Sequence, residues 1–207
     1  VSAKVKEDYP TAKELFNKCL KLDKNNAASH YQLADVYKIL SNYDSALSYA
    51  KNALELEPKN KWYREINGDL YWITRDRPKA ILLYEGLLEE FPETRAYYSR
   101  LQEFYNREKN TDKEIELVKK EIAYFGSNNK RISKLSNLLL SQGKNEEAKA
   151  LWLKEIKENP LNDTAYEKLG RIYFFGKEQE KLETHYKEAF EKLPYNSKIT
   201  KAYIEHV

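Results

Sequence analysis

Prolines and tyrosines recur along this 207-residue chain at multiples of a single spacing. Four prolines are separated by 34, 68 and 34 residues: Pro58, Pro92, Pro160 and Pro194. Four tyrosines are separated by 34, 34 and 68 residues: Tyr37, Tyr71, Tyr105 and Tyr173. A fixed period of this length is the sequence signature of a repeat architecture, in which each repeat buries its apolar face only against its neighbours. The chain is therefore predicted to be an array of repeats.

The array can be written as rows of equal length that need no insertion: residues 27–60, 61–94, 95–128, 129–162 and 163–196. Position seven of the rows is mostly leucine, and position eight is mostly small, with Ala34, Gly68, Gln102, Ser136 and Gly170. Position twenty is mostly alanine, and position thirty-two is proline in four of the five rows. Apolar residues three and four apart predict two amphipathic helices in each row, and the proline is expected to end the second one.

These columns resemble the tetratricopeptide repeat, and the resemblance extends over almost the whole chain. It implies an all-α fold, a right-handed superhelical solenoid of stacked antiparallel helix pairs. It also implies that position eight faces the partner helix of the same repeat. Glycine inside a helix costs roughly 1 kcal/mol relative to alanine, so Gly68 and Gly170 are expected to permit a closer approach of the two backbones.

The same register predicts a single array over residues 1–207. Residues 1–26 are expected to be a partial repeat, mainly its second helix, and residues 197–207 the first helix of a truncated repeat. The chain is thus interpreted as a fragment of a longer array, whose exposed ends could self-associate. Cys19 falls in a column of small packing residues and is expected to be a buried, inert thiol.

The third row, residues 95–128, departs from the pattern. Gly126 replaces its terminal proline and suits a helix end with a left-handed residue. Residues 111–114, TDKE, fit a capping box, in which Thr111 would accept a hydrogen bond from the Glu114 backbone amide.

Catalytic and cofactor-binding motifs for nucleotides, zinc proteases, serine hydrolases and kinases are all absent from the sequence. The three histidines, His30, His185 and His206, have no Cys or His partner at the spacing of metal ligands. We therefore expect no enzymatic activity, no cofactor and no metal site. A structural role is expected for His30.

Charge composition limits the class of partner. The 36 Lys and Arg against 33 Asp and Glu leave a net charge of +3, too balanced to predict nucleic-acid binding from a long-range field. Helical repeats that read RNA have a period of 35 rather than 34 residues. No apolar run is long enough to span a bilayer. The compartment stays open: the cytoplasm is favoured, with a bacterial periplasmic or exported location as the alternative.

In tetratricopeptide proteins the concave surface is lined by positions two, five, nine, twelve and thirteen of each first helix. The resemblance therefore implies a groove at these candidate residues: Tyr31, Asp35, Trp62, Glu65, Asp69, Trp72, Ile73, Glu103, Arg107, Asn137, Arg171, Phe174 and Phe175. Each exposed aromatic is either an anchor for a partner or packing against the next repeat. Acidic residues gather at positions five and nine of the first three rows, and basic residues gather in the C-terminal part. A basic and apolar ligand is expected to suit the N-terminal half.

The resulting hypothesis is a non-catalytic protein–protein interaction scaffold whose groove binds a peptide segment or a partner helix. The alternative is a recruiting or assembly arm of a larger enzyme, or of a secretion or membrane-associated complex. The C-terminal tail of a heat-shock protein is not expected as a ligand. In the first row, positions five and nine hold Tyr31 and Asp35, where tail-binding members of the family carry lysine and asparagine.

Overall fold

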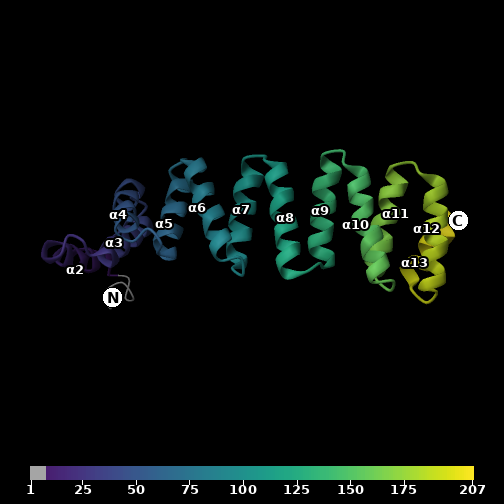
Figure 1. Cartoon of the computed structure of the whole chain (residues 1–207), viewed down its shortest axis with the longest axis horizontal. Coiled ribbons are helices and arrows are strands. Elements are labelled where there is room, and N and C mark those ends of the chain that lie inside the picture. Colours follow the sequence, from purple (N-terminus) through teal and green to yellow (C-terminus); the bar gives the residue numbers. More distant parts are fainter. Residues whose placement is uncertain (1–7) are drawn as a thin grey trace. The chain divides into compact units, whose positions relative to one another are not determined.

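The computed structural model describes residues 8–207, which form two compact units, residues 8–108 and residues 109–207. These described residues contain twelve helices and no strand (Figure 1). The all-α repeat solenoid predicted from the period is therefore confirmed. Residues 1–7 of the predicted N-terminal partial repeat lie outside the described residues.

The first unit contains six helices, each packed against the next one along the chain. They are α2 (Tyr9–Leu22), α3 (Ala27–Ile39), α4 (Tyr43–Leu56), α5 (Lys61–Ile73), α6 (Arg77–Glu90) and α7 (Arg95–Arg107). Helices α3 and α5 also contact each other. These two first helices thus lie side by side.

The second unit also contains six helices packed in chain order. They are α8 (Thr111–Phe125), α9 (Asn129–Ser141), α10 (Asn145–Glu158), α11 (Asp163–Phe175), α12 (Gln179–Lys192) and α13 (Ser197–His206). One apolar cluster runs through all six, and it includes the buried side chains of Val118, Leu135, Trp152, Leu169 and Leu182. Contacts of α9 with α11 and of α11 with α13 place these first helices side by side.

Helix starts follow the period. The first helices begin at Ala27, Lys61, Arg95, Asn129, Asp163 and Ser197, in steps of 34 residues. Five of them are preceded by an asparagine whose side chain accepts a hydrogen bond from a backbone N–H of the first turn: Asn26, Asn60, Asn128, Asn162 and Asn196. An N-cap asparagine satisfies a donor that the helix cannot pair internally. The assignment of these helices to five whole and two partial repeats stays a prediction.

Turns between the first and the second helix share one backbone conformation. The residue at position fifteen of each row has a positive φ: Ser41, Arg75, Lys109, Gly143 and Lys177. Only Gly143 adopts this conformation without a steric cost from a side chain. The turn therefore places four residues in the left-handed region, which most side chains disfavour.

The helical glycines contact the second helix of their own pair, as the resemblance implied. A Cβ atom added to Gly68 would lie 2.7 Å from Cε2 of Tyr84, and one added to Gly170 would lie 2.5 Å from Cζ of Tyr186. Both tyrosines are buried. The missing side chain is what lets each ring pack against the backbone of the facing helix.

Cys19 is exposed, so the expectation of a buried thiol was wrong. Its counterparts one and five rows on, Ala53 and Ala189, are fully buried. Those residues lie on helices packed between two neighbours, whereas among residues 8–207 α2 packs against α3. Cys19 therefore lacks the cover that its counterparts receive.

The predicted capping box at Thr111 was also wrong. The N-cap of α8 is Asn110, whose side chain accepts a hydrogen bond of 3.1 Å from the Lys113 backbone N–H. Thr111 is already the first helical residue, because asparagine one position earlier caps the helix in its place. At the other end of α8, Gly126 has a φ of 79° and a ψ of 167°. Its φ is positive, which glycine permits, but this ψ lies outside the left-handed helical region that the sequence predicted.

Candidate functional site

The side chains at positions two, five, nine, twelve and thirteen of α3, α5, α7, α9 and α11 are called here the first-helix face. In the first unit this face carries exposed apolar side chains at Ile39, Trp62 and Ile73. Trp62 is 54% exposed, and its ring contacts the Lys61 ammonium at 4.6 Å from the ring centroid. Trp62 and Ile73 are thus available to a ligand.

Two other aromatic candidates of this face are engaged in packing. Trp72 on α5 stacks on the fully buried Phe104 of α7, with ring centroids 3.9 Å apart. The Arg77 guanidinium lies 5.3 Å from the Trp72 ring. Tyr31 packs against Tyr63 with centroids 5.2 Å apart. Trp72 therefore serves as packing between adjacent first helices, one of the two interpretations that the sequence left open.

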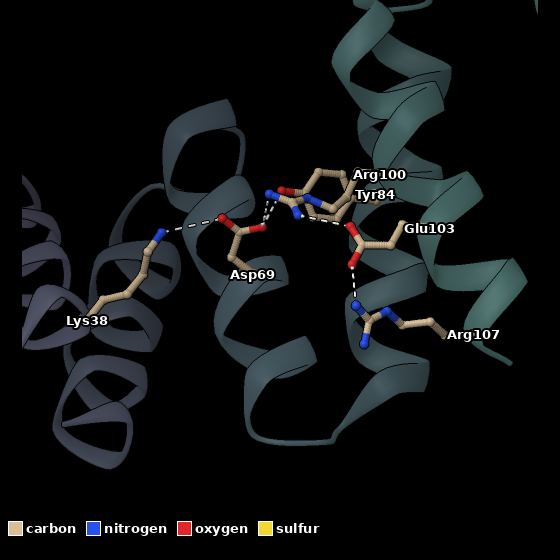
Figure 2. A network of polar contacts seen from close by, with 6 residues as sticks. All are labelled: Lys38, Asp69, Tyr84, Arg100, Glu103 and Arg107. Atoms are coloured by element: carbon tan, nitrogen blue, oxygen red, sulfur yellow. Dashed lines mark hydrogen bonds and ion pairs between the residues drawn. The ribbon is translucent and has the colours of Figure 1, made fainter. Parts of the chain in front are cut away.

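Asp69 is the centre of a polar network in the first unit (Figure 2). Its carboxylate accepts hydrogen bonds from Tyr84 at 2.8 Å and from Lys38 at 3.4 Å, and it forms an ion pair with Arg100 at 3.3 Å. Burial and the neighbouring Asp69 carboxylate raise the pKa of Tyr84 far above its usual value. The phenol therefore stays protonated and donates to Asp69.

Two further acidic candidates of the first unit, Glu103 and Glu65, also contact side chains of that unit. Glu103 lies 3.4 Å from Arg100 and 3.3 Å from Arg107. Glu65 accepts a hydrogen bond from the Tyr97 hydroxyl, and burial followed by this bond raises the pKa of Tyr97. Asp69 and Glu103 are thus paired with cations of the same unit, whereas the partner of Glu65 is a neutral hydroxyl.

The second unit has a cavity of about 480 Å³ on its first-helix face. Its lining comes from α9, α10, α11 and the turn that follows α11: Ser136, Asn137, Leu140, Asn145, Trp152, Lys168, Arg171, Ile172, Phe175, Gly176 and Glu178. Three candidates from the sequence, Asn137, Arg171 and Phe175, are brought together here. Phe175 is 72% exposed at this cavity.

The charges around this cavity are unequal. Among residues 8–207, neither Lys168 nor Arg171 forms an ion pair with a carboxylate. The single acidic residue of the lining, Glu178, accepts hydrogen bonds from Lys149 at 2.6 Å and from Lys181 at 2.7 Å. These bonds lower the pKa of Glu178. The cavity therefore presents two cations and one carboxylate that is already occupied.

The inner wall of the cavity includes two buried, largely apolar side chains. Trp152 is buried, and its indole N–H donates a hydrogen bond of 3.0 Å to the Ser136 hydroxyl. Ile172 is also buried. Phe174 packs edge-on against the ring of Phe175 and also against the ring of His206, with centroids 5.5 Å apart in each pair. Phe174 and Phe175 thus differ in their surroundings despite their adjacent positions.

Sequence reasoning missed several residues of this cavity. Lys168 is at position six of its row, outside the five positions that the family resemblance implied. Trp152 and Glu178 come from a second helix and from the turn before one, so a pattern restricted to first helices could not include them. The excess of basic residues in the C-terminal part was the available signal for Lys168.

The histidines contribute to packing. His30 and His185 are buried, and their Nε2 atoms lie 3.0 and 2.8 Å from the carbonyl oxygens of Lys24 and Tyr166. Within residues 8–207 no group of three or more His, Cys, Asp or Glu side chains could hold a metal ion. In the same range, no helix combines the length and the apolar character needed to cross a bilayer.

Comparison with known protein families gives two matches. Models of the tetratricopeptide repeat family match residues 15–48 and residues 133–194. No curated protein sequence matches the chain.

Solved structures of similar fold cover most of the chain at low sequence identity. A chain in the structure of Naa15/Naa10 bound to HypK-THB is 16% identical with a TM-score of 0.62, and the match covers 99% of this chain and 32% of that one. This chain thus spans about a third of that relative. YrrB, a TPR protein with an unusual peptide-binding site, is 17% identical with a TM-score of 0.53 and coverages of 92% and 98%. A tetratricopeptide repeat protein from Parabacteroides merdae is 20% identical with a TM-score of 0.59 and coverages of 92% and 76%.

Proposed function

This chain belongs to the tetratricopeptide repeat family, and we propose that its first-helix face binds a peptide segment or a helix of a partner protein. Members of this family are protein–protein interaction scaffolds, and they are generally not catalytic. Stacked helical repeats offer an extended surface for such a partner.

The observation that carries this proposal is the cavity of the second unit. Its volume of about 480 Å³ lies within the range of sites that hold small ligands or single side chains. Phe175 is 72% exposed there, and sites that bind ligands are concave and lined mainly by apolar and aromatic side chains with a few polar groups. A peptide side chain in this cavity would cover Phe175 and contact Leu140.

Exposed apolar side chains of the first unit support the same role. Trp62 and Ile73 lie on the same helix, α5, and both remain partly exposed. YrrB provides a precedent for peptide binding on this fold. The alternative role, as a recruiting or assembly arm of a larger complex, would use the same surfaces.

A selection from a library of random peptides tests the proposal. The chain is immobilised, bound peptides are enriched, and their affinity is measured by fluorescence anisotropy for the wild type and for two variants, Trp62→Ser and Phe175→Ser. We expect enriched peptides whose affinity falls at least about tenfold in one or both variants, as for an interface hot spot.

Matched controls use equally exposed apolar residues outside the first-helix face. Leu82 lies on the second helix α6, and Leu161 lies in the turn before α11. Leu82→Ser and Leu161→Ser should leave the affinities unchanged. A selection without enrichment, or peptides that bind all four variants like the wild type, would refute binding at the first-helix face.

A further inference from the structure

We propose that the cavity of the second unit holds an acidic side chain, Asp or Glu, of the bound peptide, with an apolar residue of that peptide beside it. This inference rests on the proposed function and names the chemistry that the site selects. The acidic side chain would contact Lys168 and Arg171, and the apolar residue would cover Phe175.

Lys168 and Arg171 are placed to act on one carboxylate. They are three residues apart on α11, so their side chains share a face of the helix. Both line the same cavity, and among the described residues no carboxylate forms an ion pair with either. Two neighbouring cations without counterions attract an anion, and an arginine can bind a carboxylate through two parallel hydrogen bonds.

Glu178 does not neutralise these cations. Its carboxylate is held by the ammonium groups of Lys149, at 2.6 Å, and Lys181, at 2.7 Å. Lys149 is buried and also pairs with Glu146. The Glu178 carboxylate is therefore fixed by its own pair of lysines, and its charge is offset before it could act on Lys168 or Arg171.

The rest of the lining suits a carboxylate with an apolar neighbour. Asn137 and Asn145 carry amide N–H groups that can donate to an oxygen anion. Leu140, Trp152, Ile172 and Phe175 form the apolar part of the lining. A lysine of a ligand would instead meet Lys168 and Arg171 and be repelled.

The contrast with the first unit strengthens the assignment. There the equivalent charged positions neutralise one another, since Asp69 pairs with Lys38 and Arg100, and Glu103 pairs with Arg107. That face offers no uncompensated cation pair of this kind. Selection for a negative charge is thus expected at the second unit's cavity.

Three labelled peptides test the inference on the full chain. They alternate leucine with glutamate, glutamine or lysine, and both ends are blocked, so that a terminal carboxylate cannot contribute. Fluorescence anisotropy at about 0.05 M salt should give an affinity for the glutamate peptide at least about tenfold higher than for the glutamine peptide. Raising the salt to about 0.5 M should remove most of this difference, because screening weakens exposed ion pairs.

Charge-removing variants locate the effect. Arg171→Gln and Lys168→Gln should each lower the affinity for the glutamate peptide by about fivefold or more. The affinity for the glutamine peptide should stay unchanged. Lys187→Gln, on the exposed surface of α12 and outside the cavity, should alter neither. Arg171 is exposed, so a thermal melt like that of the wild type is expected to confirm that the variant is folded.

The outcomes separate this inference from the proposed function. Equal binding of the glutamate peptide to wild type and Arg171→Gln would overturn the acidic-side-chain assignment. The proposed function would still stand if Phe175→Ser lowered the affinity for peptides from the random selection. A fourth peptide, with glutamine side chains and a free C-terminal carboxylate, completes the test: if it bound more tightly than the blocked glutamate peptide, the cavity would recognise a chain end, and the assignment would be wrong.

Discussion

The hydroxyl of Tyr84 on α6 donates a hydrogen bond of 2.8 Å to the Asp69 carboxylate on α5, and this bond joins the two helices of one repeat (Figure 2). Tyr84 is buried and its ring also packs edge-on against Phe104 at 5.5 Å. The same tyrosine thus fills the space beside Gly68 and anchors the carboxylate that two cations share.

Removing this hydroxyl should destabilise the first unit. Tyr84→Phe keeps the ring but leaves Asp69 without its most buried donor, and hydrogen bonds to charged groups contribute about 1.5–3 kcal/mol. Chemical denaturation should show a loss of this size in the free energy of unfolding. Lys38→Ala removes a longer, more exposed contact of Asp69 and should cost less than about 1 kcal/mol. Equal losses in the two variants would contradict the central role of Tyr84.

Close packing at Gly170 predicts intolerance of a larger residue. Gly170→Leu would force the buried Tyr186 ring to move, since a Cβ atom would already lie 2.5 Å from its Cζ. We expect a loss of about 1–3 kcal/mol, as for other overpacked cores. Combining Gly170→Leu with Tyr186→Leu should recover part of that loss. An unchanged melting temperature for Gly170→Leu would disprove the contact.

The two tryptophans of α5 should respond differently to truncation. Trp72→Ala removes the stack on Phe104 and should lower stability by about 1–3 kcal/mol. Trp62 is 54% exposed, so Trp62→Ala should change stability by less than about 0.5 kcal/mol. Thermal melts followed by circular dichroism distinguish the two. A Trp72→Ala variant as stable as the wild type would make Trp72 a candidate ligand anchor instead.

The left-handed turn residues offer a route to a more stable chain. Lys177 is exposed and has a φ of 57°, so Lys177→Gly should relieve steric strain and stabilise by up to about 1 kcal/mol. Gly143 has a φ of 72°, and Gly143→Ala should destabilise by about 1 kcal/mol for the same reason. Melting temperatures that shift in the same direction for both variants would refute this account.

Stability should fall in mildly acidic solution because of His185. Burial lowers the pKa of His185 below its usual 6.5, and its Nε2–H donates to the Tyr166 carbonyl. The unfolded chain therefore binds a proton more readily than the folded chain. The contribution of neutral His185 to the free energy of unfolding is complete above pH 6.5. It decreases as the pH falls below this value toward the folded-state pKa.

Denaturation curves of the wild type and His185→Gln between about pH 5 and pH 7.5 check this prediction. The wild type should lose more unfolding free energy over this range than the variant. Glu178 and Asp163, whose pKa values are lowered by hydrogen bonds, affect the free energy of unfolding in a separate and lower pH range. Their stabilisation is complete above their usual values of 4.5 and 3.8 and is lost at lower pH. Parallel curves for wild type and variant would exclude His185 as the cause.

Local signals predicted the helices well because they act within a few residues. The 34-residue period, the terminal prolines and the small residues at position eight were sufficient to predict an all-α repeat solenoid. Two expectations were wrong. At α8, Asn110 rather than Thr111 is the N-cap, because it lies one residue earlier. Cys19 was misjudged because its burial depends on a neighbouring helix, which its column alone does not specify.

The sequence by itself determined the repeat, its helices and which residues share the first-helix face, because a regular period repeats the same local geometry in every row. Tertiary structure alone decided which of those residues remain available. Trp72 and Asp69 find their partners, Phe104 and Arg100, 32 and 31 residues further along the chain, whereas Lys168 and Arg171 find no carboxylate within their unit. Pairing across helices depends on side-chain packing, and a spacing rule that treats every row alike carries no information about it.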